Sequence, residues 1–132
     1  MATVTPFNVS VEVAEPKTGM VQAVLNELID QLQNFSNNAH PHVIDITSLP
    51  LTQQDKQELE TLLGRGEVQI TLSTIGESQI YETAYSGVWW IKHFTPDEKI
   101  ISELIEINNI PEIIKSHDED IEQAAHAIKS IR

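Results

Sequence analysis

Acidic side chains interrupt two otherwise apolar or aromatic stretches of the sequence. Glu82 stands just before a Tyr-Ser-Gly turn signal, and Glu106 lies inside an isoleucine-rich stretch. Two carboxylates in one cleft can carry out acid–base chemistry, with a histidine such as His93 as a further proton carrier. If the three groups converge, the chain is a small ligand-binding or acid–base enzyme domain. The alternative is that both carboxylates lie on the solvent face of their strands.

A second possibility is metal binding at His40-Pro-His42. With Asp45, this pair could supply imidazole and carboxylate ligands, which predicts a histidine-based metal carrier as an alternative function. However, Pro41 favours an extended backbone, and the next histidine lies fifty residues further on. We therefore expect no metal and no cofactor. The chain contains no cysteine, which excludes disulfides, thiolate zinc sites and cysteine nucleophiles.

The composition narrows the choice of partner. The chain has 132 residues, and 20 acidic against 8 basic side chains give a net charge of −12, which disfavours a nucleic acid partner. No apolar run approaches the length of a membrane span, and the N-terminus lacks the pattern of a secretory signal. No Gly-x-Ser-x-Gly elbow or phosphate-binding glycine pattern is present. We expect a cytoplasmic protein that contacts neither nucleic acid nor membrane.

Aromatic residues are concentrated in one short stretch, where Tyr81, Tyr85, Trp89, Trp90 and Phe94 make up five of the seven in the chain. Such density usually indicates a core. Successive side chains of a strand point to opposite faces, so the two adjacent tryptophans cannot enter the same core. The one that faces away from that core could be covered by another layer of the domain, by a second copy of the chain or by another protein, and we expect it to be exposed, beside Glu82. Tryptophan is enriched at binding hot spots, so it would contact another protein or a second copy in a homodimer.

The periodicity of the sequence predicts the elements that position these residues. Residues 1–18 look like a loosely ordered arm, and residues 19–132 like a single domain. A capping box at Thr52 and Asp55 predicts the start of the second helix, and Gly64 its end. Residues 99–108 fit a helix or a strand, and their β-branched content favours a strand. The expected order is a helix at 19–35, a strand at 42–47, a helix ending at 63, strands at 68–72, 79–85, 88–94 and 99–108, a helical turn at 110–114, and a helix at 116–132.

This order predicts an α+β fold. Short spacing between the later strands implies hairpins, which gives a mainly antiparallel sheet with a meander of about four strands plus one or two extra strands. The three helices are expected to pack on one face of that sheet.

Three segments resemble the C-terminal conserved region of the HupH/HyaF hydrogenase expression proteins. They are Leu62-Leu-Gly-Arg-Gly-Glu-Val68, Gln79-Ile-Tyr-Glu-Thr-Ala-Tyr-Ser-Gly-Val-Trp-Trp90 and Ile105-Glu-Ile-Asn-Asn-Ile-Pro-Glu-Ile113. The element Glu-Thr-x-x-x-Gly-Val-Trp-Trp is the most specific of them. Typical members of this family are about twice as long as this chain.

The resemblance implies a non-enzymatic, chaperone-like assembly factor in [NiFe]-hydrogenase maturation. Such a protein would bind an immature hydrogenase subunit, or other maturation proteins, during cofactor or iron–sulfur cluster installation. The residues carried over as candidates for this protein interaction are Glu82, Thr83, Gly87, Val88, Trp89 and Trp90, with Glu67, Glu106, Pro111 and Glu112 as weaker matches.

Overall fold

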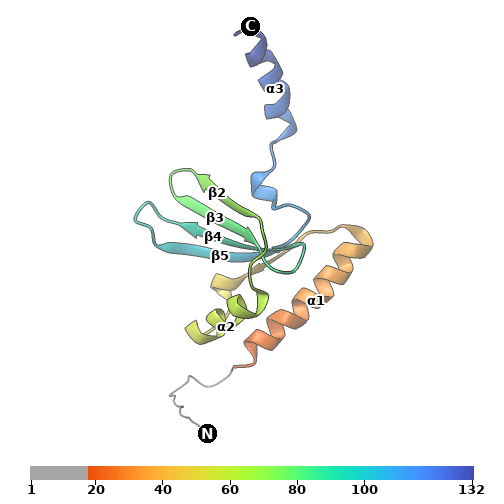
Figure 1. The fold of residues 1–132 in the computed structure, drawn as a ribbon, viewed down its shortest axis with the longest axis vertical. Coiled ribbons are helices and arrows are strands. Elements are labelled where there is room, and N and C mark those ends of the chain that lie inside the picture. Colours follow the sequence, from red (N-terminus) through yellow and green to blue (C-terminus); the bar gives the residue numbers. More distant parts are fainter. Residues whose placement is uncertain (1–17) are drawn as a thin grey trace.

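The computed structural model describes residues 18–132 (Figure 1). Of the expected N-terminal arm, only Thr18 falls within the described residues. The Thr18 hydroxyl donates a hydrogen bond of 2.7 Å to Oδ2 of Asp55, and it accepts one of 3.1 Å from the N–H of Met20. Thr18 therefore joins the start of helix α1 (Met20–Asn38) to the start of helix α2 (Gln53–Leu63).

Helix α1 runs three residues beyond its expected end at Phe35. Ser36, Asn37 and Asn38 were expected to stop it by competing for main-chain hydrogen bonds. All three are exposed and stay helical, and the end comes instead at Ala39, which adopts a left-handed φ of 55°. Its N–H donates to the carbonyl oxygen of Phe35 at 2.8 Å, which closes the last turn.

The capping box of α2 is confirmed. The N–H of Asp55 donates to Oγ1 of Thr52 at 2.9 Å, and the N–H of Thr52 donates to Oδ2 of Asp55 at 3.1 Å. Two main-chain donors of the first turn are thereby satisfied. At the other end, the N–H of Gly64 donates to the carbonyl oxygen of Glu60 at 2.9 Å.

A five-stranded sheet with the order β1-β5-β4-β3-β2 forms the centre of the molecule, and every neighbouring pair is antiparallel. The meander and the single extra strand are as predicted, and residues 100–107 are a strand. The first strand is shorter than expected, because Ile46–Ser48 turn into a 3₁₀ helix, η2, in which the N–H of Thr47 is capped by the side chain of Asp45. The strands are β1 (His42–Asp45), β2 (Gln69–Ser73), β3 (Glu77–Glu82), β4 (Val88–Phe94) and β5 (Ile100–Ile107).

The two tryptophans lie on opposite sides of the sheet, and both are buried. Trp90 is 0% exposed and belongs to the main core, between the sheet and helices α1 and α2. Trp89 is 4% exposed and belongs to a smaller apolar cluster with Ile80 and Ile91 on the other face. The expectation of an exposed tryptophan is therefore wrong. A second layer on the far face, which includes Ile114 of the 3₁₀ helix η3 (Glu112–Ile114), packs against that cluster.

Helix α3 (Asp118–Lys129) forms as expected but does not join α1 and α2 on the covered face of the sheet. It extends away from the sheet, at the end of the molecule opposite α2 (Figure 1). The chain leaves the sheet through η3 and an extended link whose ends, Lys115 and His117, have β-type backbone angles. No residue of α3 is buried. Among the described helices, none combines the length and the apolar character that crossing a membrane requires.

Candidate functional site

Glu82, Thr83 and Gly87 form the tight turn between β3 and β4. Oε2 of Glu82 accepts a hydrogen bond of 2.9 Å from the N–H of Gly87, whose φ of 83° is a left-handed conformation that favours glycine. The N–H of Thr83 donates to the carbonyl oxygen of Val88 at 2.8 Å. The hydroxyl oxygen of Thr83 accepts a hydrogen bond of 3.2 Å from the N–H of Tyr85. These residues of the predicted set therefore hold the shape of this turn.

The same turn is tied to the end of α2. The N–H of Gly66 donates to the carbonyl oxygen of Glu82 at 2.8 Å, and the N–H of Ala84 donates to that of Leu63 at 2.9 Å. A Cβ atom added at Gly66 would lie 2.6 Å from the carbonyl oxygen of Thr83, so only glycine lets the two segments approach this closely. The Leu-Leu-Gly-Arg-Gly segment and the Glu-Thr segment thus form one unit.

Glu106 organises the loop that follows β5. Its carboxylate is buried, and Oε2 accepts hydrogen bonds from Nδ2 of Asn108 at 2.9 Å and from the N–H of Glu112 at 3.0 Å. The carbonyl oxygen of Asn108 accepts from Nε1 of Trp89 at 3.0 Å. Pro111, also buried, precedes the first residue of η3. Hydrogen bonds from Lys115 and then Asn108 hold the pKa of Glu112 below its ordinary value.

The structure does not bring Glu82, Glu106 and His93 together. Glu82 and Glu106 lie on either side of Trp89, to which both are paired in the sheet register, and each carboxylate accepts from groups of its own loop. His93 lies four residues further along β4, about 13 Å away at the rise of a strand. Its Nδ1 is 2.7 Å from Oγ of Ser78. The three groups therefore share a face of the sheet but no common substrate position.

The two histidines of the metal-carrier hypothesis have different surroundings. Nε2 of His42 lies 2.6 Å from a carboxylate oxygen of Glu27 on α1, while His40 is exposed in the loop before β1. In residues 18–132, no group of three or more histidine, cysteine, aspartate or glutamate side chains is arranged to hold a metal ion.

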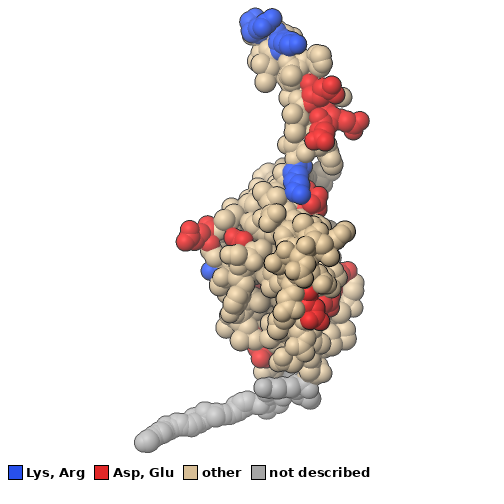
Figure 2. All heavy atoms as spheres, turned by 90° about the vertical axis from the view of Figure 1, so that its right-hand side faces the viewer, with Lys and Arg blue, Asp and Glu red and all other residues tan. Residues whose placement is uncertain are grey.

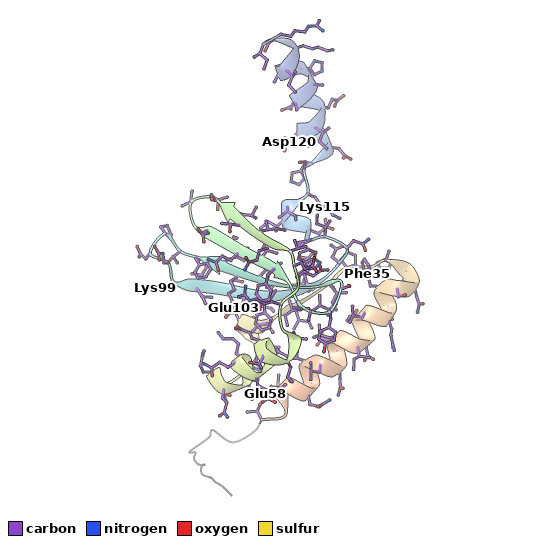
Figure 3. All side chains as sticks on the ribbon, in the orientation of Figure 1. Phe35, Glu58, Lys99, Glu103, Lys115 and Asp120 are labelled. Carbon is purple, nitrogen blue, oxygen red and sulfur yellow. The ribbon has the colours of Figure 1, made fainter. Side chains whose placement is uncertain are left out.

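A further acidic residue, Glu103 on β5, was not singled out from the sequence. It is 2% exposed, on the side of the sheet that faces α2 (Figure 3). Oε1 accepts from Nζ of Lys56 at 2.6 Å, and Oε2 accepts from Nε1 of Trp90 at 2.9 Å. The signal that pointed to Glu106, an acid within an apolar strand, applies equally to Glu103. Its carboxylate pairs with a partly buried lysine and with a buried indole.

Two further groups have shifted pKa values. Burial, aided by the charge of Glu60, raises the pKa of Tyr81 to about 12, and the guanidinium of Arg65, 4.0 Å above its ring, opposes this rise. Hydrogen bonds from Thr18 and from the main chain of Thr52 hold the pKa of Asp55 below its ordinary value. Both groups are structural, because Tyr81 belongs to the main core and Asp55 is part of the capping box of α2.

An apolar cavity of about 320 Å³ opens beside the turn between β3 and β4. We call it the α1–α2 groove. Tyr85, which is 55% exposed, stands at its edge and is the link between the groove and the turn. Other apolar residues of the lining are also partly exposed, such as Ile29 at 52% and Leu62 at 47%. Its lining consists of Gln22, Leu25, Leu28, Ile29, Leu32, Leu62, Leu63, Tyr85 and Val88.

The fold and the site together define an α+β protein with one antiparallel sheet, a framework of buried hydrogen bonds, and an apolar groove beside the turn that this framework shapes. Residues 20–132 match the family described as HupH hydrogenase expression protein, C-terminal conserved region. The chain belongs to this family.

Relatives and a solved structure bear the same family names. The chain is 29% identical over 125 residues to the hydrogenase expression/formation protein HoxQ of Azotobacter vinelandii, covering 92% of this chain and 44% of that protein. It is 31% identical over 106 residues to the hydrogenase-1 operon protein HyaF of Escherichia coli, covering 80% and 36%. The structure of hydrogenase expression protein HupH from Thiobacillus denitrificans is 35% identical, with a TM-score of 0.80 and coverage of 84% and 92%. The chain thus spans less than half the length of these two curated relatives.

Proposed function

We propose that this chain is a non-enzymatic assembly factor in [NiFe]-hydrogenase maturation that binds an immature hydrogenase subunit during cofactor or iron–sulfur cluster installation. The names of the relatives support a role in hydrogenase expression or formation. The chemistry of the described residues supports binding over catalysis, because the candidate carboxylates hold main-chain groups of their own loops.

One observation carries the proposal of where binding occurs. Tyr85 lies within the Glu82–Trp90 segment, at a position that the pattern Glu-Thr-x-x-x-Gly-Val-Trp-Trp leaves open, and it lines the α1–α2 groove. Tyrosine combines a large apolar ring with a polar tip and is enriched at binding hot spots. The groove is lined mainly by leucine, isoleucine and valine. Its partner is then an apolar segment that an immature hydrogenase subunit leaves uncovered before its cofactor is in place.

The residues carried over from the family resemblance act mainly indirectly in this proposal, although Val88 also lines the groove. Trp89 and Trp90 are buried, so they support the contact surface from within and do not touch the partner. Thr83, Gly87 and Val88, with Glu82, fix the turn that presents Tyr85. Glu106, Pro111 and Glu112 hold the neighbouring loop that accepts the Trp89 indole N–H.

The test is a capture experiment with a tagged chain and the large and small hydrogenase subunits, each produced without the maturation machinery and identified by mass spectrometry. We expect one of the subunits to be retained. Leu62→Asp and Tyr85→Ala should each reduce retention by about tenfold, as for loss of a binding hot spot. Both positions are half-exposed, so we expect both variants to fold.

Ile75→Asp is the matched control, because Ile75 is 91% exposed in the turn between β2 and β3 and does not line the groove. Retention should be unchanged in this variant. Capture of neither subunit contradicts the proposed function. Capture that is equally strong with both groove variants contradicts the proposed surface.

A further inference from the structure

Helix α3 lacks the packing that a helix of its length needs. It contains 12 residues, and no residue in it is buried. Isolated helices shorter than about 12–15 residues are only marginally stable in water, and most helices in proteins are stabilised by packing of an apolar face. The hydrogen bonds that reach α3 from the described chain are those of its own turns and caps. A stable α3 therefore requires a surface to pack against.

The face that would pack is well defined. Ile121, Ala125 and Ile128 follow one another at spacings of four and three residues, so they lie in line along the helix. Ile121 is 57% exposed and Ile128 is 62% exposed. Ala124 extends the stripe on one side, and alanines let a second helix approach closely. Such a stripe, with charged residues around the rest of the surface, is typical of a helix that pairs with another helix.

The charges of α3 are separated along its axis. Its first turn holds three acidic side chains, and its last turn holds His126 and Lys129. Figure 2 shows the acidic groups at the end near the sheet and the basic groups at the free end. On a helix of 3.6 residues per turn, Asp118, Glu122 and Lys129 fall on one flank of the apolar stripe. In an antiparallel pair of such helices, Lys129 of each copy faces Asp118 and Glu122 of the other.

We propose that α3 pairs antiparallel with α3 of a second copy of this chain. The pairing is symmetric, as in most homodimers, with Ile121 of one copy against Ile128 of the other. Overall charge favours this occupant. The segment from Asp118 to Arg132 has four acidic and two basic side chains, and the whole chain has a charge of −12. Packing α3 onto another part of an acidic copy brings like charges together, whereas the antiparallel pair brings opposite charges together.

The size of the interface sets the affinity that we expect for the dimer. A 12-residue helix is about 18 Å long, so two of them bury less than the roughly 1,200 Å² typical of stable interfaces. We therefore expect reversible dimerisation, with a Kd between about 10 µM and 1 mM. This inference does not depend on the proposed function, since no residue of α3 lines the α1–α2 groove and α3 extends away from the sheet that α1 and α2 cover (Figure 1).

Sedimentation velocity of the intact chain over this concentration range tests the proposal. We expect a shift from monomer to dimer, and Ile128→Glu should weaken it at least tenfold. Gln123→Glu is the matched control, because it adds the same charge on the opposite side of the helix, and it should leave the dimer intact. A chain that stays monomeric at 1 mM overturns the proposal, as does a dimer that Ile128→Glu does not weaken.

A pair of charge variants tests the antiparallel direction. Lys129→Glu makes the flank of one chain wholly acidic, and the double variant Asp118→Lys/Glu122→Lys makes the flank of another wholly basic. We expect each variant alone to be monomeric and their equimolar mixture to form heterodimers. A mixture that remains monomeric, or single variants that still dimerise, contradicts the antiparallel charge pairing.

Discussion

Lys56→Met is expected to destabilise the fold substantially, because it leaves the carboxylate of Glu103 without its ion-pair partner inside the core. The Glu103 side chain is 3% exposed, and its Oε1 lies 2.6 Å from Nζ of Lys56. Removing one partner of a buried pair costs about 3–5 kcal/mol. The Lys56 side chain is itself 25% exposed, so some water can reach the vacated site, and we expect about 3 kcal/mol, the lower end of that range.

Glu103→Gln, alone and combined with Lys56→Met, shows how much of this loss of stability comes from the unpaired charge. Glu103→Gln keeps an oxygen that can accept from the Trp90 indole and leaves an uncharged group in the core, so we expect a loss of about 2 kcal/mol. In the double variant no charge remains buried, and its loss should be about 2 kcal/mol, well below the additive value of about 5. Urea unfolding at pH 7, followed by far-ultraviolet circular dichroism, measures these differences as shifts of the midpoint of about 1–1.5 M.

Lys115→Met is the matched control. Lys115 also forms an ion pair, with Glu112 at 2.7 Å, but both side chains are largely exposed. Ion pairs of this kind contribute little, so the midpoint should not change measurably. If Lys56→Met has as small an effect as Lys115→Met, or if the losses of the Lys56 and Glu103 variants are additive, the ion pair is not coupled as the geometry implies, and the reasoning is wrong.

Two further variants test the link between α2 and the turn, and the cap of α2. Gly66→Ala should lower the free energy of unfolding by about 1–3 kcal/mol, because its Cβ would lie 2.6 Å from the carbonyl oxygen of Thr83; an unchanged urea midpoint would contradict this. Asp55 has a pKa below its ordinary 3.8, so its contribution to stability is present above that value and lost as pH falls through the lower pKa of the folded state. Between about pH 6 and pH 2, the free energy of unfolding should therefore fall less in Asp55→Asn than in the unmodified chain. An equal fall in both proteins would contradict this role of Asp55.

The local features of the fold could be predicted because they depend on neighbouring residues. Thr52 and Asp55 are three residues apart and cap each other, and the alternating pattern of residues 68–72 reports a strand directly. The placement of α3 depends on the direction in which the chain leaves β5, and no periodicity records that direction. The sequence predicts an amphipathic helix there, while its position in space is set by the extended link at Lys115–His117.

The candidate site was predicted less well, and for a physical reason. Alternation along a strand correctly separates Trp89 from Trp90, but the layer over Trp89 is built by residues distant in the sequence, such as Ile114. Glu82 and Glu106 attract attention as acids among apolar residues, yet their hydrogen-bond donors include the main-chain N–H groups of Gly87 and Glu112. Every residue except proline has such a donor, so side-chain types alone cannot distinguish a structural carboxylate from a catalytic one.

The placement of Trp89 and Trp90 on opposite sides of one sheet gives the protein two separate optical reporters. The chain has only these two tryptophans. Trp90→Phe leaves the indole of the smaller cluster as the only tryptophan fluorophore, and Trp89→Phe leaves the indole of the core beneath α1 and α2. Emission from the two variants then follows the solvation of each face of the sheet independently. Whether the two hydrophobic layers open together or in sequence thus becomes visible with no external dye attached to the chain.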